Sequence, residues 1–154
     1  MEKISFKQVF KGSVSVLGGS LKYPQNEKPE VERWIVTLPP QSFGDWHIHL
    51  VPEFFYVQTG TLYVVNELED KSLAVATFGD GDHGLTDCHV PQFIWNPDKT
   101  SSVTVIAIYF GCSGIEATQS LGKKPSQELL NNLLDQTVKN NLTEESNLAG
   151  KRKK

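Results

Sequence analysis

Short apolar runs with alternating polar positions occupy most of the chain up to residue 110. Val, Ile, Thr and aromatic residues fill the runs, and Gly, Pro, Asn and Asp separate one run from the next. This pattern is typical of β-strands joined by turns, and no helical period lies between the runs. We therefore predict an all-β fold, a sandwich or barrel with an antiparallel sheet. The predicted strands are residues 4–10, 13–18, 31–38, 45–49, 53–59, 61–68, 72–78, 92–96 and 102–110.

One predicted strand and two predicted loops refine this picture. Both alternating faces of residues 102–110 are largely apolar, which favours a strand in the barrel core or at a dimer contact. Residues 23–30 are polar and contain two prolines, and residues 80–89 are acidic and rich in glycine. Both segments are expected to be loops.

Beyond Gly111 the pattern changes from strands to a helix. Pro125 and Ser126 precede a segment with apolar residues at helical spacing, which predicts an amphipathic helix within residues 121–142. We expect its apolar stripe to cover the outside of the barrel rather than bind a separate helix, because a lone helix needs packing to persist. Residues 143–154 are expected to form a disordered basic tail. The residues of the stripe are Leu129, Leu130, Leu133, Leu134 and Val138.

Length and charge narrow the function classes. With 154 residues and 38% hydrophobic content, the chain is expected to form one globular domain. The net charge is -3, and the four basic residues at 151–154 leave the rest of the chain near -7, which disfavours a nucleic-acid partner. No apolar stretch is long enough for a signal peptide or a membrane span, so we expect a cytoplasmic protein without a membrane partner.

The segment FGDWHIHLVPEFFYVQTG, residues 43–60, concentrates candidate chemistry. Side chains two apart on a strand share a face, so His47 and His49 are expected to project together, with Trp46 on the opposite face. A turn at Pro52 would start a new strand at Glu53 and return its carboxylate toward the histidines. Such buried groups are costly unless paired, and a divalent cation satisfies all three at once. The alternative is a metal-free hydrogen-bonded His/Glu network.

The same segment resembles the first signature of the cupin superfamily, which runs His-x-His, three or four residues, Glu, six residues and Gly. His47, His49, Glu53 and Gly60 match it, and Gly44 lies closer to the first His than the family's leading Gly usually does. Cupins are small double-stranded antiparallel β-barrels of jelly-roll type. The resemblance therefore implies a cupin-like barrel in residues 1–120, followed by the helix.

The second cupin signature is degenerate in this chain. Only its outer Gly and Asn are kept, Asp87 and His89 replace its Pro and second Gly, and Gln92 stands where the fourth metal ligand is normally His. Three alternatives follow: Gln92 binds the metal through its amide oxygen, His89 takes that place through an altered loop, or the metal has three protein ligands. Gln92 is favoured because its offset to Asn96 is that of the family. The positions in register are Gly81, Asp87, His89, Gln92 and Asn96.

Two histidines, a carboxylate and an amide oxygen form a hard ligand set with open positions. Fe(II), Mn(II) and Ni(II) suit this set, and Zn(II) is a further option. The resemblance implies His47, His49 and Glu53 as metal ligands, with Gln92 as the favoured fourth. Small planar or enolic substrates would suit a pocket lined by aromatic residues. The predicted pocket-lining residues are Phe55, Phe93, Trp95 and His89.

The predicted function is that of a metal-dependent small-molecule enzyme, with a dioxygenase favoured marginally over an isomerase or lyase. Two histidines and one carboxylate form the ligand set of many non-haem iron sites. The alternative is a non-catalytic cupin that binds or senses a small ligand, and a homodimer is expected in either case. No catalytic acid or base is assigned, and the candidates are Tyr56, Tyr63, Asp87, Cys88 and His89.

Overall fold

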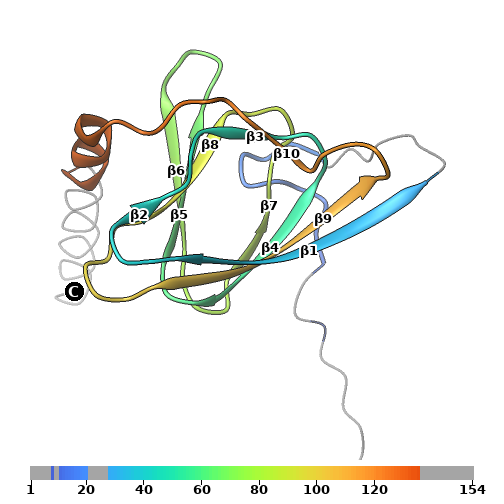
Figure 1. Ribbon diagram of the computed structural model, residues 1–154, viewed down its shortest axis with the longest axis horizontal. Helices are drawn as coiled ribbons and strands as arrows, with labels where there is room; N and C mark the ends of the chain where they lie inside the picture. Colours follow the sequence, from blue (N-terminus) through green and yellow to red (C-terminus); the bar gives the residue numbers. More distant parts are fainter. Residues whose placement is uncertain (1–7, 9–10, 21–27, 136–154) are drawn as a thin grey trace, which may run out of the picture.

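The computed structural model describes residues 8, 11–20 and 28–135, which form two antiparallel sheets and one helix (Figure 1). The all-β prediction with a C-terminal helix is confirmed. In hydrogen-bonded order, the four-stranded sheet contains β1 (Pro29–Leu38), β9 (Val103–Cys112), β4 (Glu53–Thr59) and β7 (His83–Leu85). The six-stranded sheet contains β10 (Thr118–Ser120), β3 (His47–His49), β8 (Gln92–Asn96), β5 (Leu62–Glu67) and β6 (Leu73–Phe78), and β2 (Ser42–Phe43) also pairs with β8.

Seven of the nine predicted strands form, and the differences concern short segments. Residues 13–18 were wrongly predicted as a strand: they contain one bridge, between Val14 and Ser20, and a turn. Asp87 holds this turn, since its carboxylate accepts hydrogen bonds from the Ser15 hydroxyl (2.5 Å) and the Leu17 amide (3.1 Å). The predicted strand at residues 4–10 lies almost entirely outside the described residues. Sequence patterns missed β2, β7 and β10, which are too short to show alternation.

The inner faces of the two sheets enclose an apolar core. Phe55 and Val105 from the four-stranded sheet pack against Leu62 and Val64 from the other sheet. Gly84 in β7 makes room for the Phe55 ring, because a Cβ atom there would lie 2.5 Å from it. The alternating inward residues of β9 thus enter the core, as predicted from its apolar pattern.

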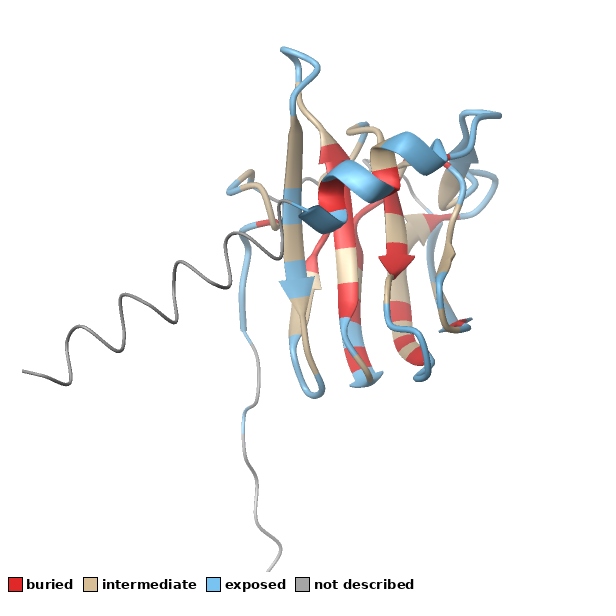
Figure 2. Cartoon of the chain, turned by 90° about the vertical axis from the view of Figure 1, so that its left-hand side faces the viewer, coloured by how far each residue is buried: buried red, intermediate tan, exposed pale blue. Residues whose placement is uncertain are grey.

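A second apolar core lies on the outer face of the six-stranded sheet, beneath the helix at residues 127–135 (Figure 2). Leu130 and Leu133 pack there against aromatic residues of the sheet, as expected for a helix that covers the barrel. Leu134 is 39% exposed and does not belong to the buried stripe. Val138 and the predicted tail at residues 143–154 lie outside the described residues. The sheet residues of this core are Trp46, Val65, Phe93 and Trp95.

Gly60 connects the two sheets rather than closing a hairpin within one sheet. It follows β4 of the four-stranded sheet and precedes β5 of the six-stranded sheet. Its φ is 85°, and a Cβ atom at this position would lie 2.8 Å from the Ser102 carbonyl oxygen, so both the backbone conformation and the space require glycine. Within the described part of the chain, no helix is long and apolar enough to cross a membrane.

Candidate functional site

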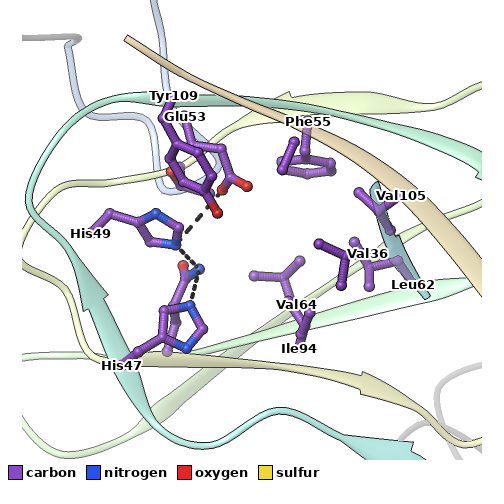
Figure 3. A pocket seen from close by; sticks show the side chains of 13 residues that line it. Val36, His47, His49, Glu53, Phe55, Leu62, Val64, Ile94, Val105 and Tyr109 are labelled. Atoms are coloured by element: carbon purple, nitrogen blue, oxygen red, sulfur yellow. Dashed lines mark hydrogen bonds and ion pairs between the residues drawn. The ribbon is translucent and has the colours of Figure 1, made fainter. Parts of the chain in front are cut away.

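A cavity of about 50 Å³ lies between the two sheets, with polar side chains gathered at one end (Figure 3). The predicted residues His47, His49, Glu53, Gln92 and Phe55 all line it. Apolar side chains from both sheets form the rest of the wall, together with Thr86 and Tyr109. The apolar members are Val36, Leu62, Val64, Ile94, Val105 and Ala107.

The two histidines lie on β3 and point into the cavity together, as their spacing predicted. Trp46 points the other way, into the core beneath the helix. The Nδ1 atom of His47 lies 2.9 Å from the Asp45 carbonyl oxygen, so that nitrogen carries the proton and Nε2 keeps a free lone pair. A ring oriented in this way is prepared to accept a hydrogen bond or a cation at Nε2.

Gln92 faces His47 directly across the β3–β8 pairing. Its Nε2 atom lies 2.6 Å from Nε2 of His49 and 3.5 Å from Nε2 of His47. The amide therefore lies between the two imidazoles and can donate one hydrogen bond to each. Gln92 thus holds the place that the sequence assigned to a fourth ligand.

Glu53 approaches the same point from the opposite sheet, as the first residue of β4. Its Oε2 atom lies 3.7 Å from Nε2 of His49. Burial raises the pKa of Glu53 to about 7, and the hydroxyl groups of Tyr109 and Thr86, which face the carboxyl, oppose this rise. Glu53 is therefore close to the balance between its neutral and charged forms at neutral pH.

His49 is the most enclosed of the polar residues that line the cavity, with 1% of its surface exposed. Burial lowers its pKa to about 3, and the nearby His47 contributes to this shift, so the ring is neutral. Its Nδ1 atom is buried without a hydrogen-bond partner among the described residues. A neutral imidazole with a lone pair in an enclosed site is a suitable metal ligand.

Tyr109 is a site residue that the sequence analysis did not identify. It pairs with Glu53 across the β4–β9 ladder, and its ring stacks on His49 with a centroid distance of 5.7 Å. Burial and the Glu53 charge raise the pKa of Tyr109 above its usual value, so the phenol keeps its proton. The sequence shows that Tyr109 shares a face of the strand with Val105 and Ala107. It does not show the strand register that places Tyr109 beside Glu53.

The four polar side chains have the chemistry of divalent-cation ligands. Around an ion bonded at about 2.1 Å, neighbouring ligand atoms lie about 3 to 3.5 Å apart. Of the three separations, 3.5 Å between Gln92 and His47 lies at the end of this range, 3.7 Å between His49 and Glu53 lies just above it, and 2.6 Å between Gln92 and His49 is a hydrogen-bond distance. In the described residues, no group of His, Cys, Asp and Glu side chains alone could hold a metal ion. The set needs Gln92, with its amide turned so that oxygen, not nitrogen, faces the imidazoles.

Three predicted pocket-lining residues do not line the cavity. Phe93 and Trp95 belong to the core beneath the helix, because they alternate with the inward-facing Gln92 and Ile94 along β8. His89 lies outside the cavity wall, although its backbone N–H donates to the His49 carbonyl oxygen at 2.9 Å. Its φ of 63° is a conformation that favours glycine, which agrees with its place at a glycine of the cupin signature.

A second, wider hollow of about 390 Å³, termed the mouth, shares Val36 and Tyr109 with the cavity wall. Tyr109 thus lines both the inner cavity and the mouth. Trp34 and Glu32 of β1 form one wall of this mouth, and the Glu32 carboxylate accepts a hydrogen bond from the Trp34 indole at 3.0 Å.

Comparison by sequence finds no matching family model and no matching curated protein. Solved structures do match. Bacillus subtilis oxalate decarboxylase, described with Mn(II) centres, aligns with a TM-score of 0.50 and 17% identity over 70% of this chain and 35% of its own length. The DMSP lyase DddQ from Ruegeria pomeroyi aligns with a TM-score of 0.51 and 16% identity, over 62% of this chain and 45% of its own.

A third structural match is to a vicilin from Capsicum annuum, with a TM-score of 0.50 and 17% identity over 60% of this chain and 24% of the vicilin. The chain spans about a third of the length of the decarboxylase, and less of the vicilin. At such low sequence identities, the structural matches show a shared fold and not a shared activity. Two packed antiparallel sheets with inward-facing histidines on β3 agree with the resemblance in the first signature. The chain therefore has a cupin-like fold.

Proposed function

We propose that this protein is a metal-dependent enzyme that acts on a small molecule inside the barrel. His47, His49, Glu53 and Gln92 would hold one divalent transition metal, with Fe, Mn or Ni favoured over Zn. The bound ion would supply Lewis-acid chemistry or, as iron, redox chemistry. The observation that carries the proposal is the convergence of these four groups, from both sheets, at the polar end of an otherwise apolar cavity.

The residues around the ligands suit particular tasks. The Tyr109 phenol stays protonated and hydrogen-bonds with Glu53, and it could exchange this bond for one to a substrate oxygen that arrives from the mouth. Phe55 and the aliphatic wall exclude water and favour a flat or apolar substrate body. Dioxygenase chemistry is the first reaction class to test, and a lyase or isomerase is the next.

A second candidate function is non-catalytic binding of a small ligand. The Gln92 amide can satisfy both imidazoles by hydrogen bonds without any cation. The same cavity would then accept a small ligand against Tyr109 and the apolar wall.

Metal content separates the two candidates. Protein purified without chelators or a metal-binding tag, then incubated anaerobically with each metal ion in turn, is analysed by mass spectrometry for bound metal. We expect near-stoichiometric metal in the wild type and none in the His47→Ala, His49→Ala double variant. His83→Ala is the matched control, because His83 lies in β7 outside the cavity wall and its loss should leave the metal content unchanged.

Metal absent from the wild type, or retained by the double variant, would contradict the enzyme proposal and leave the ligand-binding candidate. If the metal is iron, oxygen consumption with small carboxylate and enol substrates comes next. If it is manganese or nickel, product analysis without oxygen takes precedence. In either assay, Tyr109→Phe should lower the turnover rate while leaving the metal content unchanged.

A further inference from the structure

The mouth carries negative charge that no described residue neutralises. Glu32 of β1 and Glu116, which precedes β10, are the charged residues of its wall, and no basic side chain among the described residues lines it. Neither carboxylate forms an ion pair within the described part of the chain. The two residues belong to different sides of the hollow, because β1 is a strand of the four-stranded sheet and β10 of the six-stranded sheet. A positive group in the mouth would therefore be attracted by both walls.

Aromatic rings line the same hollow. Glu32, Trp34 and Val36 alternate along β1, and Val36 also lines the inner cavity, so all three lie on the inward face of the strand. Trp34 is nevertheless 56% exposed, and its indole hydrogen bond to Glu32 orients the ring. Tyr109 supplies a second ring. Exposed aromatic rings beside unpaired carboxylates suit an organic cation, which is attracted to the face of a ring as well as to the negative charge.

Paired residues connect the mouth with the candidate metal ligands. Tyr109 of β9 lies opposite Glu32 on one side and opposite Glu53 on the other. Since neighbouring strands lie about 4.8 Å apart, the backbones at Glu32 and Glu53 are about 10 Å apart. On the other sheet, Thr118 of the mouth wall pairs with His49, whose buried Nδ1 atom has no hydrogen-bond partner among the described residues. This unfilled hydrogen-bonding capacity is independent of the two carboxylates and points to a polar ligand group next to the mouth.

We propose that the mouth binds the cationic group of a small substrate, an alkylated ammonium group, while the oxygen-bearing end of the substrate reaches His47, His49 and Glu53. The inference deepens the proposed function and rests on it for the role of that second end. The volume of about 390 Å³ lies within the usual range of small-molecule sites. The two groups of the substrate would lie about 5 to 10 Å apart, which is one to two strand spacings. A negative group in the mouth would be repelled by the two carboxylates, so the mouth should also select against anionic groups at that end.

Choline and its uncharged analogue, in which carbon replaces the quaternary nitrogen, form a probe pair of equal shape. Calorimetry at low salt measures the affinity of the metal-free full chain for each probe. We expect choline to bind about tenfold more tightly than the analogue, because only choline is attracted as a cation to the carboxylates and the ring faces. Trp34→Leu should weaken choline binding about fivefold, and Trp34→Phe should restore most of the loss.

Substitutions of the carboxylates test the dependence on charge. Glu32→Gln and Glu116→Gln should each weaken choline binding about threefold and leave the affinity for the analogue unchanged. Glu128→Gln is the matched control, because it removes the same charge from an exposed position on the helix and should change neither affinity. Choline affinity that does not exceed that of the analogue overturns the proposal. It is equally overturned if the preference for choline survives the combined Glu32→Gln, Glu116→Gln substitution, or if Glu128→Gln lowers it as much.

The metal content of the same proteins separates this inference from the proposed function. The Glu32→Gln, Glu116→Gln double variant should bind metal as the wild type does, because neither residue is a candidate ligand. A preference for choline in a wild type that binds no metal would support the cationic ligand and contradict the metal-dependent reaction. Metal binding without a preference for choline would overturn the cationic substrate class and leave the proposed enzyme.

Discussion

The two sheets contribute different parts of the site and are protected in different ways. The six-stranded sheet supplies His47, His49 and Gln92, and the helix covers its outer face. The four-stranded sheet supplies Glu53 and Tyr109, and the outer edge of its strand β1 is exposed. The imidazoles and the carboxylate therefore meet only when the sheets pack on each other. Site formation and core formation are one event, whereas the helix stabilises the site only through the sheet beneath it.

The difference between the two cores is tested most strongly by Phe55 and Phe93, which the sequence analysis placed in the same pocket. Phe55 lies between the sheets, and Phe93 lies between one sheet and the helix. Each is buried, at 2% and 0% exposure, so replacement by Ala should lower the free energy of unfolding by about 3 to 5 kcal/mol in both cases. Only Phe55→Ala should also enlarge the cavity and weaken metal binding.

Chemical denaturation gives the stability of both variants, and metal titration at a temperature where both are folded gives the affinity. Phe93→Ala serves as the control for a general loss of stability. Equal loss of metal affinity in the two variants would contradict the separation of the two cores.

Substitutions in the helix test the same difference between the two cores, with a smaller expected effect on stability. Leu133 is 3% exposed in the core beneath the helix, so Leu133→Ala should lower the free energy of unfolding by about 2 to 4 kcal/mol. Leu134→Ala is its matched control and should cost less, because Leu134 is 39% exposed. Metal stoichiometry should stay that of the wild type in both variants. Loss of the metal in Leu133→Ala alone would show that the helix shapes the site directly.

The sequence predicted the structure best in long segments of alternating apolar and polar residues and at the intact first cupin signature. It located most long strands, the shared direction of His47 and His49, and the place of Gln92. It could not show that β3 and β4 belong to different sheets, because alternation reports a face and not a partner strand. For the same reason it missed Tyr109, whose role depends on the β4–β9 register. The prediction that Phe93 and Trp95 line the pocket was wrong for another reason. Alternation along the strand from Gln92 already places both residues on the opposite face of the sheet.

The smallest expected effect concerns protons at the junction of the two sheets. With a pKa of about 7 in the metal-free protein, Glu53 holds a proton below neutral pH, and this proton competes with a cation. His49, with a pKa of about 3, binds no competing proton above about pH 4. Metal affinity should therefore fall about tenfold per pH unit below pH 7 and level off above it, as metal titrations at several pH values would show.

The same two groups also set the pH dependence of stability without metal. The folded pKa of His49 lies below its unfolded value of 6.5, so this group destabilises the fold as pH falls from 6.5 toward 3. The folded pKa of Glu53 lies above its unfolded value of 4.5, so its contribution is present below pH 4.5 and is lost as pH rises to 7. The contributions of the two groups oppose each other between pH 4.5 and 6.5, so the pair adds little pH dependence there and lowers stability below pH 4.5. Glu53→Gln should remove the opposing contribution, so that stability rises more steeply with pH in the variant than in the wild type across this window. Denaturation of both proteins at several pH values would contradict the assignment if the two profiles ran parallel.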